Sequence, residues 1–156
     1  MNRFYTYRNN EAIQAAHRII PNSILNRLHF DYFIGADPIY AGISNYEKAT
    51  DGRSYRDTAC VMYPWHFRLT KEKTTIVIPK ERTPRTIIHE IGHVIDEYLG
   101  FEHIAVPVTE YAKTDRYEAI AEAFTAWLLL GYANYPCKTV SGIDLKTESL
   151  FESLRL

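Results

Sequence analysis

Two histidines and a glutamate in one short stretch are the residues of this chain best suited to metal chemistry. The stretch reads His89-Glu90-Ile91-Gly92-His93. Residues four apart lie one above the other on a helix, so both imidazoles can reach a single metal ion. Glu90 is rotated by about 100° from His89 and can lean over the open side of that metal. Its carboxylate could then take a proton from a metal-activated water, as in the HExxH helix of zinc metalloproteases.

A catalytic zinc site needs a third protein ligand, and several residues are candidates. His103 lies in the region after the motif but shows no supporting pattern. Glu118 and Glu122 lie one turn apart on a predicted core helix, where an unpaired carboxylate is costly to bury. One would bind the metal, and the other would accept the N–H of a ligating imidazole and fix its tautomer. Spacing does not choose between them, and Asp115-x-x-Glu118 also matches a helix capping box.

A longer series of residues resembles a known family of zinc endopeptidases. The series comprises His89-Glu90-Ile91-Gly92-His93-Val94-Ile95-Asp96, Thr109-Glu110-Tyr111-Ala112 and Glu118-Ala119-Ile120-Ala121-Glu122-Ala123-Phe124. In this order the three stretches resemble the catalytic domain of anthrax lethal factor and the related Pro-Pro endopeptidases. Both are zinc endopeptidases of the gluzincin type, and the resemblance covers about residues 74–130.

The resemblance implies a set of metal ligands. His89, His93 and Glu118 would bind one Zn²⁺ per chain, because the first glutamate of the E-x-x-x-E pair is the ligand in that family. Glu122 would then support a ligand histidine through a hydrogen bond.

Two further residues receive catalytic roles from the same comparison. Glu90 would act as the general base toward the attacking water. Tyr111 would point into the site and help to stabilise the oxyanion of the reacting carbonyl group.

The helix that carries the motif is clearly delimited. Thr83 can cap it, Pro84 suits its first position, and Gly100 is placed to end it. Its buried stripe consists of Ile87, Ile88, Ile91, Val94, Ile95, Tyr98 and Leu99. The two motif histidines fall on a different face together with Asp96. Asp96 could bond a ligand histidine or simply lie near the helix end, and it is not part of the predicted site.

The remaining pattern predicts an α+β fold. Helices are expected at 10–20, 114–130 and 144–154, and strands at 29–34, 58–63, 67–69 and 74–78, with 71–73 as a hairpin turn. Helices and strands do not alternate as βαβ units. Together with the resemblance, this predicts one compact, minimal zincin-like (gluzincin) domain over residues 1–156. A small mixed sheet would contribute an edge strand packed on the HExxH helix, beside a glutamate-bearing core helix.

The β-branched run Thr74–Ile78 is a candidate site for an extended protein or peptide substrate. Such a strand could present an open edge and bind the substrate by β-augmentation, although an ordinary edge strand has the same pattern. Residues 35–56 form a long segment with scattered Gly, Pro, Asp and Asn. A loop of that length is usually functional or disordered, and one interpretation is that it flanks a cleft.

Composition excludes some partners. A formal net charge of -1 gives no reason to expect a nucleic acid or a membrane surface. No stretch approaches the roughly 18 apolar residues of a membrane span. The N-terminus lacks the apolar core of a signal peptide, so a cytoplasmic location is expected, with non-classical export left open. Cys60 lies in an apolar run and is expected to be a buried thiol.

These observations predict a zinc-dependent endopeptidase that hydrolyses peptide bonds of a protein substrate. One alternative is a catalytically inactive module that binds peptides on the same fold. Another is a protease dedicated to one regulatory protein. The intact set of His89, Glu90, His93, Glu118 and Tyr111 argues against the inactive module.

Overall fold

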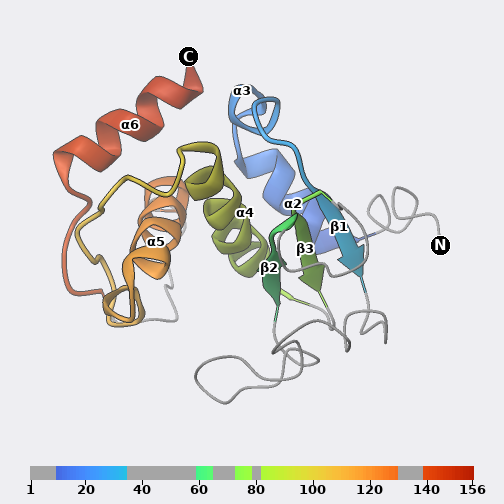
Figure 1. Cartoon of the computed structure of the whole chain (residues 1–156), viewed down its shortest axis with the longest axis horizontal. Coiled ribbons are helices and arrows are strands. Elements are labelled where there is room, and N and C mark those ends of the chain that lie inside the picture. The colour runs from blue at the N-terminus through green and yellow to red at the C-terminus, as the bar shows by residue number, and fades with distance from the viewer. Residues whose placement is uncertain (1–9, 35–58, 65–72, 79–81, 130–138) are drawn as a thin grey trace.

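A computed structural model describes residues 10–34, 59–64, 73–78, 82–129 and 139–156. The helices are α2 (Glu11–Ile19), α3 (Asn22–Leu25), α4 (Pro84–Tyr98), α5 (Arg116–Leu129) and α6 (Leu145–Arg155), with a 3-10 turn η3 (Tyr111–Lys113). The strands are β1 (Asp31–Ile34), β2 (Cys60–Met62) and β3 (Thr75–Ile78). This mixed arrangement confirms the predicted α+β class (Figure 1). Within the described residues, no helix is long and apolar enough to cross a membrane.

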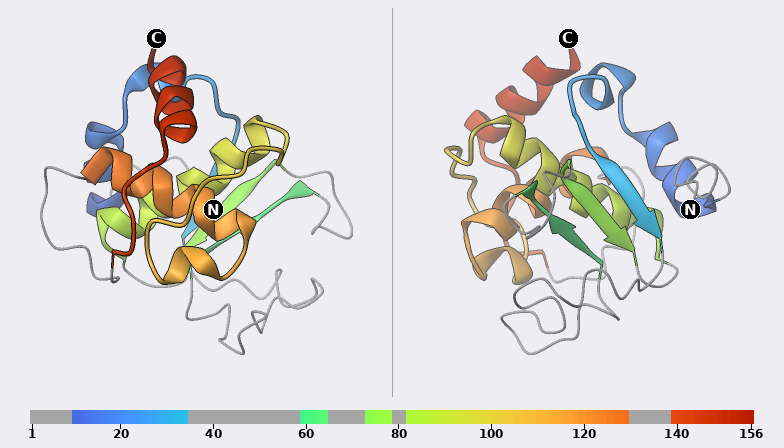
Figure 2. Two further views of the ribbon diagram at one scale, coloured as in Figure 1. Left: turned by 90° about the vertical axis from the view of Figure 1, so that its left-hand side faces the viewer. Right: turned by 45° about the vertical axis from the view of Figure 1, so that its right-hand side comes forward.

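The three strands form one mixed sheet in the order β1-β3-β2. β1 pairs with β3 in parallel, and β2 pairs with β3 in antiparallel fashion. The right-hand view of Figure 2 shows the three strands side by side. Every residue of β3 is buried, as expected for a middle strand covered on both faces.

This topology corrects one prediction. The run Thr74–Ile78 does not present an open edge, because β3 is paired with a strand on each side. The antiparallel neighbour of β3 is Cys60–Met62. The predicted strand at 67–69, residues 71 and 72 of the hairpin turn and the 35–56 loop lie outside the described residues. Among the strands described, β1 and β2 lie at the edges of the sheet, and β2 contacts α4.

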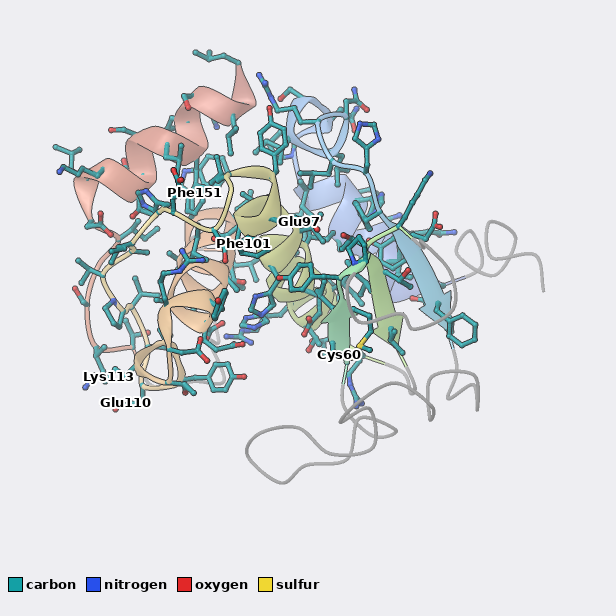
Figure 3. All side chains as sticks on the ribbon, viewed as in Figure 1. Cys60, Glu97, Phe101, Glu110, Lys113 and Phe151 are labelled. Atoms are coloured by element: carbon teal, nitrogen blue, oxygen red, sulfur yellow. The ribbon has the colours of Figure 1, made fainter. Side chains whose placement is uncertain are left out.

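Helix α4 lies between α5 and the sheet (Figure 1). Its isoleucines join Ile13 and Ala16 of α2 and Ile76 and Ile78 of β3 in one apolar core. On the other side of the core, Phe151 of α6 packs on Phe124 of α5 with ring centroids 5.4 Å apart (Figure 3). Apolar side chains from several elements therefore pack around α4.

The predicted boundaries of α4 are confirmed. The Thr83 side chain accepts a hydrogen bond from the backbone N–H of Thr86, and Pro84 occupies the first turn. Gly100 follows the helix with a φ of +74°, a conformation that glycine adopts without a steric cost. Residues Ile87–Asp96 are all buried. The polar side chains in that run therefore require partners inside the protein.

Gly92, inside the HExxH motif, sets how closely α4 approaches α5. A Cβ atom added at Gly92 would lie 2.8 Å from the Cα of Ala121 and 3.2 Å from its carbonyl oxygen. These are backbone atoms, so they cannot move aside as a flexible side chain would. Glycine at this position allows the two helices, and the side chains that they carry, to approach one another closely.

We expect Gly92→Ala to destabilise the protein and to weaken binding of the zinc ion predicted from the sequence. Overpacking a core lowers the free energy of unfolding by about 1–3 kcal/mol, whereas the better helix propensity of alanine raises it by at most about 1 kcal/mol. Separating α4 from α5 also moves His89 and His93 away from Glu118. Urea unfolding and zinc titration measure the two effects. Gly142→Ala is the control, because nothing lies within 4 Å of a Cβ atom there. Equal behaviour of the two variants would contradict the prediction.

Candidate metal centre

The side chains of His89, His93 and Glu118 converge between α4 and α5. Each offers one potential ligand atom, and these atoms all lie within 4.8 Å of one another. The Glu118 carboxylate spans both imidazoles, with Oε2 3.0 Å from His89 Nε2 and Oε1 3.2 Å from His93 Nε2. Two imidazole nitrogens and one carboxylate oxygen form a donor set suited to zinc, which binds three protein ligands and a water molecule in catalytic sites. These three residues could therefore hold a metal ion.

The backbone N–H and the side chain of Glu118 have different partners. Its backbone N–H donates to the Asp115 side chain at 2.8 Å, so Asp115 caps the start of α5. In a complete capping box the glutamate side chain would turn back to the cap residue. Here it reaches His89 and His93 instead. The capped start of α5 therefore holds the backbone of Glu118, while its carboxylate contacts the two imidazoles.

Glu122, one turn further along α5, contacts the other side of His89. Its Oε2 lies 2.8 Å from His89 Nδ1. If Nδ1 carries the proton, it donates to Glu122, and Nε2 is left with its lone pair toward Glu118 and the metal position. The two glutamates thus contact different nitrogens of one imidazole. The sequence pattern had left their roles interchangeable.

Two residues that the sequence analysis did not single out hold Glu122. Arg85 Nη2 donates to both carboxylate oxygens at 3.1 Å, and the Thr109 hydroxyl donates to Oε1 at 3.0 Å. Glu122 is fully buried, so its charge needs these partners. Arg85 lies one turn before His89 on the same face of α4, a spacing that could have indicated its role.

His103 and Asp96 lie in a separate network. His103 Nε2 is 2.7 Å from the Thr147 hydroxyl of α6, so His103 does not join the His89–His93–Glu118 cluster. Both carboxylate oxygens of Asp96 accept from Arg116 Nη2, at 2.8 and 2.7 Å. Arg116 also donates to the His103 carbonyl oxygen. Asp96 therefore joins α4 to Arg116 at the start of α5, and Arg116 lies two residues before Glu118.

Glu90 of α4 is close enough to β2 for its charge to act on Cys60 and on Tyr63, just after the strand. It is buried, with 6% of its surface exposed. Burial and the nearby Glu90 charge both raise the pKa of Cys60 in β2, which is a free thiol. The Tyr63 hydroxyl, just after β2, donates to the His93 carbonyl oxygen at 3.4 Å. The end of β2 and the HExxH helix are therefore in direct contact beside the cluster.

Tyr111 lies at the start of η3, next to His89. Its ring centroid is 5.8 Å from that of His89, at an interplanar angle of 54°. The side chain is half-buried. The sequence analysis expected Tyr111 near the site, and the structure brings its ring next to a member of the metal cluster.

The charged side chains of the cluster shift one another's pKa values. Burial lowers the pKa of His89, but hydrogen bonds with Glu118 and Glu122 outweigh it and raise that pKa to about 10. Burial would raise the pKa of Glu118, yet its hydrogen bonds to His89 and His93 hold that pKa well below its usual range. The metal-free cluster thus consists of an imidazolium between two carboxylates, and a metal cation would take the place of the proton.

This arrangement predicts how the stability of the metal-free protein depends on pH. The pKa of His89 rises from 6.5 to about 10 on folding, so its contribution is fully present below about pH 6.5. That contribution is lost as the pH rises toward 10. We therefore expect the urea midpoint of the metal-free protein to fall as the pH rises from about 6.5 to about 10. The zinc-loaded protein should show a smaller fall, because zinc replaces the proton. Identical slopes with and without zinc would contradict the assignment to His89.

Comparisons with protein-family models, with curated proteins and with solved structures each gave no match. Membership of the gluzincin family and a zincin-like fold therefore stay predictions. The function proposed below depends on the residues of the cluster and on their geometry.

Proposed function

We propose that this chain is a zinc-dependent endopeptidase whose metal ion is held by His89, His93 and Glu118. The observation that carries the proposal is the convergence of these three ligand atoms from two helices, within 4.8 Å of one another. Glu90 lies beside them on α4 and has no place among the three ligands. Zinc bound by such a donor set lowers the pKa of a water molecule toward about 7 and polarises a carbonyl group.

Three residues around the metal position transfer the proton, stabilise the oxyanion and orient a ligand histidine. Glu90 accepts the proton of the attacking water and later delivers it to the leaving amine. Its burial suits this role, because proton transfer is then shielded from bulk solvent. Tyr111 donates its hydroxyl proton in a hydrogen bond to the oxyanion that forms at the scissile carbonyl, where one such donor contributes about 3 kcal/mol. Glu122 holds the ring of His89 in orientation.

The peptide substrate lies in extended form beside β2, in place of the originally predicted β3. β2 pairs with β3 along one side and contacts α4. Among the described strands, none pairs with its other side. A peptide that pairs with this edge passes the face of α4 that carries Glu90. Main-chain hydrogen bonds would thus orient the scissile carbonyl group toward the cluster.

Mapping of new protein N-termini across a proteome tests the proposal. Purified wild-type protein loaded with zinc is compared with the Glu90→Ala variant on the same lysate. We expect new N-termini with a common flanking sequence only in the wild-type sample. Zinc bound at about one ion per chain without any new N-termini would contradict peptidase activity and favour a module that binds peptides without cutting them. Absence of zinc binding would contradict the metal site itself.

A further inference from the structure

The hydroxyl group of Thr109 joins two parts of the candidate site that are separate in sequence. It donates to Glu122 Oε1 at 3.0 Å and accepts from the backbone N–H of Ala112 at 3.1 Å. An ionised carboxylate only accepts hydrogen bonds, so the single hydroxyl proton is committed to Glu122. The lone pairs of the same oxygen remain available for Ala112. Thr109 is buried, with 1% of its surface exposed.

A continuous series of hydrogen bonds follows from these contacts. Glu122 is hydrogen-bonded to His89 Nδ1 and to the hydroxyl group of Thr109, and that hydroxyl group is hydrogen-bonded to the N–H of Ala112. Ala112 directly follows Tyr111 in η3. The position of the Tyr111 backbone is thereby tied to the carboxylate that orients a proposed zinc ligand.

Two backbone hydrogen bonds and one ion pair of this turn join residues of the turn to one another. The backbone bonds Lys113 N to Glu110 O and Thr114 N to Tyr111 O lie within the turn itself. The Glu110–Lys113 ion pair is about half exposed, and such a pair contributes little. Figure 3 shows both side chains at the outer end of the turn. Val108 and Thr109 also bond residues 139–141, which belong to a different part of the chain.

We propose that Thr109 is a positioning residue that holds Tyr111 at the metal centre through Glu122. Its catalytic consequence rests on the proposed peptidase function, whereas its structural consequence does not. Valine has the shape of threonine without the hydroxyl group, so it removes both hydrogen bonds and keeps the volume. Serine retains the hydroxyl group and loses only a methyl group.

The structural consequence is tested without any substrate. Hydrogen–deuterium exchange of the segment containing Ala112 is measured on zinc-loaded wild type, Thr109→Val, Thr109→Ser and the control Glu110→Gln. We expect exchange at Ala112 to be about tenfold faster in Thr109→Val, the size of one lost hydrogen bond. Thr109→Ser should restore protection, and Glu110→Gln should resemble the wild type. Unchanged exchange in Thr109→Val would overturn the proposal.

The catalytic consequence is tested by a double-mutant cycle with Tyr111→Phe, on a peptide that the N-terminal mapping identifies. We expect Thr109→Val to lower kcat about tenfold with little change in KM. In the Tyr111→Phe background the same change should have almost no further effect, because the group that it positions is gone. Independent, multiplying losses would overturn the proposal. If the wild type cleaves no peptide, the peptidase function fails, and the exchange measurement still decides the role of Thr109.

Discussion

Replacing Glu90 with glutamine is expected to lower kcat for peptide hydrolysis by about a thousandfold while zinc content stays near one ion per chain. Glutamine matches glutamate in size but cannot accept the proton of the attacking water at neutral pH. Glu90 is not among the three residues whose ligand atoms converge, so its loss should leave metal binding intact. Steady-state kinetics and metal analysis on the same preparation measure the two quantities.

The control for this substitution is Glu102→Gln, which changes an exposed glutamate in the segment after α4. It should behave as the wild type in both measurements. Substantial hydrolysis by Glu90→Gln would falsify the assignment of Glu90 as general base. Loss of zinc from Glu90→Gln would show instead that its carboxylate belongs to the metal site.

Replacing Glu118 with glutamine is expected to weaken zinc binding more than the same change at Glu122. Glu118 contacts the Nε2 atoms of both imidazoles, whereas Glu122 contacts one imidazole, through the Nδ1 atom of His89. Loss of a carboxylate that only supports a ligand histidine typically costs 10–100-fold in metal affinity. Loss of a ligand should exceed that range. Competition with a chelator of known affinity measures both values.

Glutamine is the better substitution in this comparison because alanine would have a second effect. Glu122 forms an ion pair with Arg85, and alanine would remove that ion pair and open a cavity in addition to removing the contact with His89. The exposed Glu148 of α6 supplies the control variant Glu148→Gln, for which no change is expected. A larger loss at Glu122 than at Glu118 would exchange the two proposed roles.

Several features of the fold could be predicted because they depend on neighbours in the sequence. Helix α4 begins after Thr83 and ends before Gly100 as expected, since caps and helical periodicity act within about one turn. The face shared by His89 and His93 follows from the same periodicity. The capping role of Asp115 was visible in the spacing to Glu118.

The order of the strands was not predictable in the same way. The run Thr74–Ile78 has the β-branched composition of a strand at any position in a sheet. Its neighbours come from residues 31–34 and 60–62, and pairing between distant segments leaves little local signal. The expected open edge was therefore assigned to the wrong strand.

By itself, the sequence determined which residues could do chemistry here: two histidines on one face of a helix with a glutamate beside them, and two candidate glutamates on a second helix. Only the tertiary structure decided which nitrogen of His89 each of those glutamates contacts. It also revealed Arg85, Thr109 and the Asp96–Arg116 pair as the residues that hold the arrangement. The reason is physical. Helical spacing is dictated by local backbone geometry, whereas a buried carboxylate takes its partners from whichever distant segments pack around it.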